Sequence, residues 1–111
     1  MKIQQQIHKR INEFSDICRK HDVRALYLFG SSLTKSYDEK LSDIDFFVEI
    51  DESDPIQRGE KLMSFWDKLE SFFDKKVDLL TEDSLKNPVL RKNIHKSRVL
   101  IYDGRRKKIL V

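Results

Sequence analysis

The segment at residues 43–50, DIDFFVEI, constrains the fold most strongly, because its side chains alternate with a period of two. In an extended chain the even-numbered residues, which are isoleucine, phenylalanine and valine, fall on one face. The odd-numbered residues fall on the other face and include both Asp43 and Asp45. The pattern therefore predicts a strand that packs one apolar face and directs two carboxylates to the same side.

The rest of the chain alternates between short apolar segments and segments with helical spacing. Further strands are predicted at residues 23–29, 75–81 and 98–104, and helices over residues 1–22, over residues 62–74 and from Thr81 through Pro88 to His95. This order predicts an α/β (α+β) protein with a small mixed sheet flanked by helices. Residues 105–111 are basic with an apolar end and are predicted to be a loose tail.

Length and composition limit the function classes. A chain of 111 residues, 39% hydrophobic and 37% charged, predicts a single domain, residues 1–111, with a highly charged surface. The net charge of +3 permits nucleic-acid binding without favouring it. The single cysteine, Cys18, fits a reducing compartment, and no segment reaches the roughly 20 apolar residues of a membrane helix. We therefore expect a cytoplasmic protein with no membrane contact.

Polar side chains interrupt the predicted strands at three places. Gly30 and the two serines after it, Ser31 and Ser32, follow the first strand, Asp43 and Asp45 open the second, and Asp78 lies within the third. If these strands are neighbours, the polar groups share one edge of the sheet. Taken alone, a strand-borne Asp-x-Asp can be a solvated strand end and Gly-Ser an ordinary turn, but the ordered set favours a site.

The chemistry of this set fits a nucleoside triphosphate and a hard metal ion. Two carboxylates at positions i and i+2 repel one another unless a cation neutralises them. Mg²⁺ takes one or two protein carboxylates and completes its shell with water and phosphate oxygens. A third carboxylate on the next strand could help to bind a second ion. A glycine followed by serines lets the backbone and a hydroxyl approach phosphate groups.

These residues carry a resemblance to a known family. LFGSSLTKSYDEKLSDIDFFVEI, followed by KKVDLL, resembles the minimal nucleotidyltransferases, small relatives of the DNA polymerase β superfamily. The resemblance covers residues 23–104 and implies a polymerase β-like nucleotidyltransferase fold. It also implies Mg²⁺-dependent transfer of a nucleotide from ATP or another NTP, with two metal ions.

The same resemblance implies a role for each matching residue. Gly30 and Ser31, with Ser32 beside them, correspond to the nucleotide-binding turn, and Asp43, Asp45 and Asp78 correspond to the catalytic metal ligands. The chain departs from the family pattern in the loop after the turn, where Thr34, Lys35 and Ser36 stand in place of a second glycine.

The resemblance also implies an acceptor. Minimal nucleotidyltransferases of this kind act as antitoxins that transfer AMP to a tyrosine of a HEPN-domain toxin, so we expect a HEPN-domain partner. Two alternatives stay open at this point. One is adenylylation of a small molecule or an RNA end, and the other is a catalytically weak module that neutralises its partner by contact alone.

Overall fold

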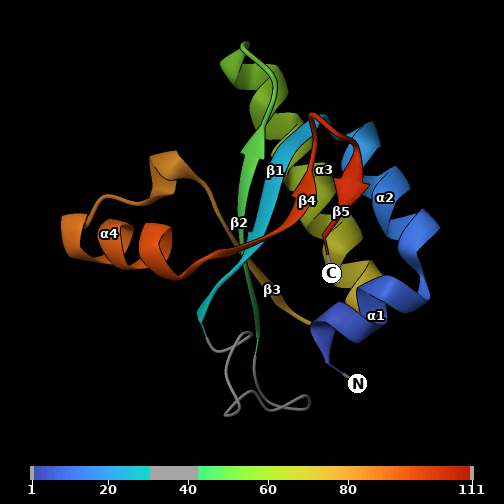
Figure 1. Ribbon diagram of the computed structural model, residues 1–111. Helices are drawn as coiled ribbons and strands as arrows, with labels where there is room; N and C mark the ends of the chain where they lie inside the picture. Colours follow the sequence, from blue (N-terminus) through green and yellow to red (C-terminus); the bar gives the residue numbers. More distant parts are fainter. Residues whose placement is uncertain (1, 31–42, 111) are drawn as a thin grey trace.

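The computed structural model describes residues 2–30 and 43–110 of the chain. Within these residues one five-stranded sheet has the order β3-β2-β1-β4-β5 (Figure 1). The strands are β1 (Val23–Leu28), β2 (Ile44–Ile50), β3 (Val77–Leu80), β4 (Val99–Asp103) and β5 (Lys108–Ile109). β1 is antiparallel to both β2 and β4, whereas β3 is parallel to β2. The predicted mixed sheet is confirmed.

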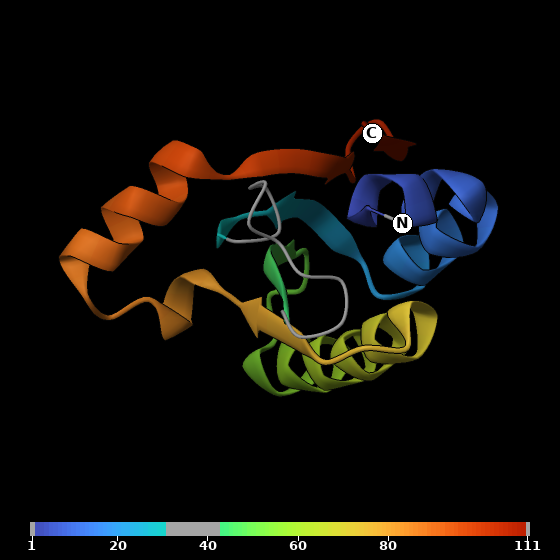
Figure 2. The same cartoon turned by 90° about the horizontal axis from the view of Figure 1, so that it is seen from below.

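Helices cover the two faces of this sheet unequally. They are α1 (Ile3–Lys9), α2 (Ile11–Lys20), α3 (Pro55–Phe73), the 3₁₀ turn η2 (Glu82–Ser84) and α4 (Pro88–Ser97). In Figures 1 and 2, α1, α2 and α3 lie together, while α4 lies by itself across the sheet. No helix in the described part of the chain is long and apolar enough to cross a membrane.

The main core lies between the sheet and the first three helices. It contains the even-numbered residues of β2, among them Phe46 and Val48, packed with Phe65 and Leu69 of α3. Phe47 points to the opposite face, where it forms a second cluster with Ile94 of α4. The period-two prediction for β2 is thus confirmed, and Phe47 is buried because α4 covers part of the second face.

The amino-terminal segment is not the single helix that we expected over residues 1–22. The backbone leaves helical geometry at Arg10, with φ −123° and ψ 45°. The Arg10 guanidinium donates to the carbonyl oxygen of Phe72 at 2.9 Å and stacks over the Phe72 ring. Because the break changes the phase of the helix, Ile11 is 37% exposed, although Ile7 and Phe14 on either side of it are buried.

The long helix α3 begins earlier than its apolar stripe indicates. Asp54 caps it, since its carboxylate accepts a hydrogen bond from the backbone N–H of Gln57, and Pro55 occupies the first turn. In the second half of α3, Trp66 donates from its indole N–H to the carbonyl oxygen of Val77 at 2.7 Å. This bond fixes α3 against the start of β3.

The predicted loose tail is wrong for residues 105–110. The chain turns after Gly104, whose N–H donates to the carbonyl oxygen of Arg24 at 2.7 Å, and returns as β5. β5 pairs antiparallel with β4, and Ile109 packs against the main core. The backbone N–H and C=O groups at the free edge of β4 form hydrogen bonds with this segment, and its basic composition does not predict such pairing.

Candidate functional site

Gly30 lies two residues after the end of β1, directly beside the carboxylate of Asp45. The backbone N–H of Phe29 donates to the carbonyl oxygen of Asp45 at 3.2 Å, which ties the end of β1 to the start of β2. Gly30 then adopts a φ of +66°, the left-handed region that favours glycine. A Cβ at this position would lie 2.7 Å from Asp45 Oδ2. Backbone conformation therefore favours glycine at this position, and a larger residue would displace the Asp45 carboxylate.

Asp78 lies beside Asp45 in the parallel pairing of β2 and β3. The two residues are direct Cα partners in the register, and the N–H of Ile44 donates to the carbonyl oxygen of Lys76 just before them. Neighbouring strands are about 4.8 Å apart, and paired residues of a parallel ladder point to the same face. Both aspartates are half-buried. The sheet thus sets two carboxylates side by side on the face that also carries Phe47.

Asp43 lies immediately before β2 and is also half-buried. Within residues 2–30 and 43–110, no group of three or more His, Cys, Asp or Glu side chains is arranged to hold a metal ion. The fold therefore brings Asp45 and Asp78 together, and a three-carboxylate cluster that includes Asp43 stays a prediction. A pair of oxygen donors fits Mg²⁺, which needs only one or two protein carboxylates.

Two of the predicted nucleotide-binding residues, Ser31 and Ser32, lie outside the described residues, as does the loop that follows them. Gly30 is the member of that turn that the structure places. Gly30 lies beside Asp45, and the register of β3 with β2 places Asp78 on the other side of Asp45. The shared sheet edge that the sequence predicts is therefore present for Gly30, Asp45 and Asp78.

An ionic cluster between η2 and α4 borders the same face of the sheet. Glu82 accepts hydrogen bonds from Arg91 and from His95 Nε2, the latter at 2.9 Å. Burial alone would raise the pKa of Glu82, but the hydrogen bonds from Arg91 and His95 outweigh it and hold that pKa below its usual value. His95 also packs against the Phe47 ring in a T-shaped arrangement, with the ring centroids 5.7 Å apart. These contacts fix α4 in place over the second cluster, and the sequence offers only a helical Arg-His spacing as a signal for them.

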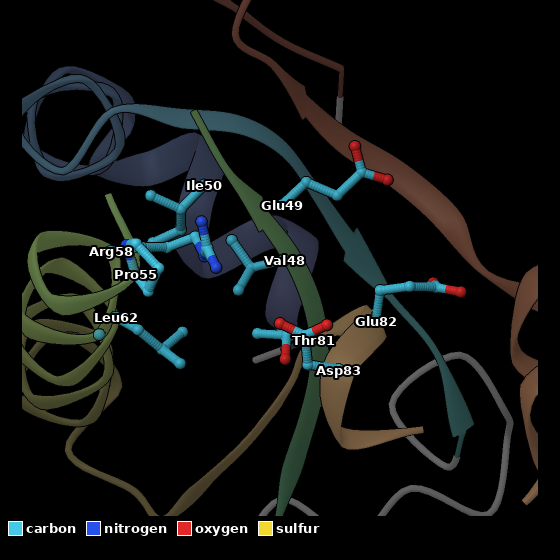
Figure 3. A pocket seen from close by; sticks show the side chains of 10 residues that line it. Val48, Glu49, Ile50, Pro55, Arg58, Leu62, Thr81, Glu82 and Asp83 are labelled. Atoms are coloured by element: carbon cyan, nitrogen blue, oxygen red, sulfur yellow. The ribbon is translucent and has the colours of Figure 1, made fainter. Parts of the chain in front are cut away.

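A surface hollow of about 500 Å³ lies at the other end of β2 (Figure 3). It forms because β3 ends at Leu80, the partner of Phe47, so that β2 extends beyond β3. Val48 and Leu62 form part of its apolar wall, while the Glu49 and Glu82 side chains extend away from that wall (Figure 3). Of the predicted site residues that the structure describes, Gly30, Asp43, Asp45 and Asp78, none lines this hollow.

Comparisons with known proteins agree with this geometry. Residues 11–101 match the nucleotidyltransferase domain family. The chain is 34% identical over 101 residues to "Putative protein adenylyltransferase MJ1379" of Methanocaldococcus jannaschii, a match that covers 84% of this chain and 99% of that protein. A second protein of that organism, "Putative protein adenylyltransferase MJ0128", is 33% identical over the same shares of both chains. The chain therefore belongs to the nucleotidyltransferase family and is a nucleotidyltransferase enzyme.

Solved structures narrow the resemblance to the minimal nucleotidyltransferases. A chain of a toxin–antitoxin complex with AMP-PNP matches with a TM-score of 0.56 and 28% identity, covering 83% of this chain and 72% of that one. A chain of the complex between a tri-AMPylated Shewanella oneidensis HEPN toxin and its MNT antitoxin matches with a TM-score of 0.54 and 26% identity. That match covers 96% of this chain and 76% of the other. The predicted fold and family are thereby confirmed.

Proposed function

We propose that this chain transfers AMP from ATP to a hydroxyl group of a HEPN-domain protein and thereby acts as an antitoxin in the cytoplasm. The observation that carries the proposal is the pairing of Asp45 with Asp78, with Gly30 against the Asp45 carboxylate. Support for the acceptor comes from the AMPylated HEPN toxin in the similar complex, and support for the donor from AMP-PNP in the other.

In the proposed reaction the acceptor oxygen forms a bond to the α-phosphorus of ATP. The bond from that phosphorus to the bridging oxygen breaks, and pyrophosphate leaves with the electron pair. Gly30 lets the phosphates approach the backbone because no side chain occupies this space. Asp78, on the neighbouring strand, orients the acceptor hydroxyl and accepts its proton.

We assign Asp43, Asp45 and Asp78 as the residues that would hold Mg²⁺, in one or two sites. When bound, the cation would supply positive charge against the phosphate oxygens. The two paired aspartates are half-buried, so charge in their neighbourhood is screened less than at an open surface. This arrangement concentrates negative charge where a cation and a triphosphate can share it.

The test uses ATP labelled at the α-phosphate, Mg²⁺ and a purified HEPN-domain protein. We expect label on the HEPN protein with the unmodified chain and none with Asp45→Asn or Asp78→Asn, while circular dichroism and melting show that both variants are folded. Asp67→Asn is the matched control, because Asp67 is an exposed aspartate on α3, away from the paired strands.

Full transfer by folded Asp45→Asn and Asp78→Asn would refute the assignment of the site. Label in an added RNA or small molecule, with none on the HEPN protein, would show that the proposed acceptor is wrong. The proposed nucleotidyl transfer itself would stand. A stable complex without label would instead support neutralisation by contact alone.

A further inference from the structure

The positively charged side chain of Arg98 lies on the face of the sheet that carries the paired aspartates. It lies between α4 and β4, and its guanidinium carbon is 4.0 Å from the centroid of the Tyr27 ring and 5.0 Å from that of Phe47. Tyr27 and Phe47 are cross-strand partners of β1 and β2. The guanidinium therefore stacks over two neighbouring aromatic rings of the second cluster.

Stacking accounts for where the guanidinium lies but not for its hydrogen bonds. Nη1 of Arg98 is buried and has no hydrogen-bond partner in the part of the chain that the structure describes. Buried polar groups are almost always paired, and an unpaired donor on a charged group is costly. The carboxylate of Glu82, which borders the same face of the sheet, already accepts hydrogen bonds from Arg91 and His95. Arg98 is half-buried, and its Nη1 is thus a buried donor that lacks an acceptor among the described residues.

The register places this donor near the candidate site. Val99, the first residue of β4, pairs with Leu28, so Arg98, the residue just before β4, lies next to the end of β1 that leads into Gly30. Phe47, over which the guanidinium lies, is two residues from Asp45 on the same face of β2. With a rise of about 3.3 Å per residue, those two side chains start roughly 7 Å apart. The cation and the carboxylate pair therefore belong to one surface.

We propose that Arg98 binds phosphate oxygens of the nucleoside triphosphate, at the β- and γ-phosphates that leave as pyrophosphate. This inference rests on the proposed function. A guanidinium donates in a planar fork that matches phosphate oxygens, and stacking on two rings fixes the plane of that fork. Phosphate oxygens would supply the acceptors that Nη1 lacks, and Arg98 would offset triphosphate charge that the aspartate pair repels.

The test measures binding of inorganic tripolyphosphate, ATP and AMP by calorimetry, with Mg²⁺ at a fixed concentration. Arg98→Met keeps the packing of the side-chain stem without its charge. We expect this variant to bind tripolyphosphate and ATP at least tenfold more weakly than the unmodified chain, and AMP less than threefold more weakly. The affinity of Arg98→Lys for tripolyphosphate and ATP should lie between those of the unmodified chain and Arg98→Met, because a point charge replaces the planar fork. Lys96→Met is the control, since it removes one positive charge from an exposed position of α4 and should change nothing.

Melting curves show whether each variant is folded, and tripolyphosphate should raise the melting temperature of the control but not of Arg98→Met. If the methionine variant does not fold, Arg98→Lys decides, and an unchanged affinity for tripolyphosphate overturns the inference. Equal ATP affinity of the unmodified chain and Arg98→Met overturns the inference while the proposed function stands. Absence of ATP binding by the unmodified chain overturns both.

Discussion

Replacement of Gly30 by alanine tests how the end of β1 supports the Asp45 carboxylate. An L-residue with a Cβ costs about 1–2 kcal/mol at the φ of +66° that Gly30 adopts. The new Cβ would also lie 2.7 Å from Asp45 Oδ2, so that the carboxylate must rotate away. Because a side chain can move more easily than backbone, we expect a total loss of about 2 kcal/mol in the free energy of unfolding. A domain of this size has roughly 5–15 kcal/mol of stability, so Gly30→Ala remains folded.

The assays are urea unfolding and labelled AMP transfer, and two other glycines provide controls. Gly59 lies inside α3, where a Cβ added to it would have nothing within 4 Å, so Gly59→Ala should stabilise the chain by about 0.5–1 kcal/mol. At Gly104 a Cβ would lie 2.2 Å from the carbonyl oxygen of Val23, so Gly104→Ala should cost more stability than Gly30→Ala because that oxygen belongs to the backbone.

Among these three variants only Gly30→Ala should lose transfer per folded molecule, since it alone displaces the Asp45 carboxylate. The reasoning fails if Gly30→Ala is as stable as Gly59→Ala, which would mean that position 30 tolerates a Cβ. It also fails if Gly30→Ala is destabilised but transfers AMP at the normal rate, because the displaced carboxylate would then be unimportant.

Three further predictions concern the scaffold. Trp66→Phe removes the hydrogen bond to the Val77 carbonyl and should cost about 1–2 kcal/mol in urea unfolding; no change would show that water replaces the indole. The hydrogen bond from Lys61 lowers the pKa of Glu52 below 4.5, so this stabilisation is present above pH 4.5 and is lost as the pH falls through the lowered value. Lys61→Met should therefore reduce the acid dependence of unfolding, and an unchanged pH profile would contradict the assignment. Ile109→Ser should lower stability by about 1 kcal/mol because Ile109 packs on the main core, whereas a loose tail would tolerate it.

Local periodicity explains why much of the site could be predicted. The alternation at residues 43–50 places Asp45 and Phe47 on the face opposite Phe46, and the two core clusters confirm this for Phe46 and Phe47. Periodicity does not predict where a helix breaks when the cause is distant in the chain. Arg10 interrupts the first helix through contacts with Phe72, which no pattern within the first 22 residues contains.

The sequence by itself determined the order of the first four strands and of the helices between them, the face of β2 that carries Asp45 and the family to which the chain belongs. The roles of the predicted site residues, Gly30, Ser31, Ser32, Asp43, Asp45 and Asp78, stay predictions. Only the tertiary structure decided that Asp78 pairs with Asp45, that Gly30 lies against that carboxylate and that Arg98 stacks on Tyr27 and Phe47. The reason is physical: a side chain's face follows from local backbone geometry, whereas strand register and stacking depend on contacts between segments far apart in the chain.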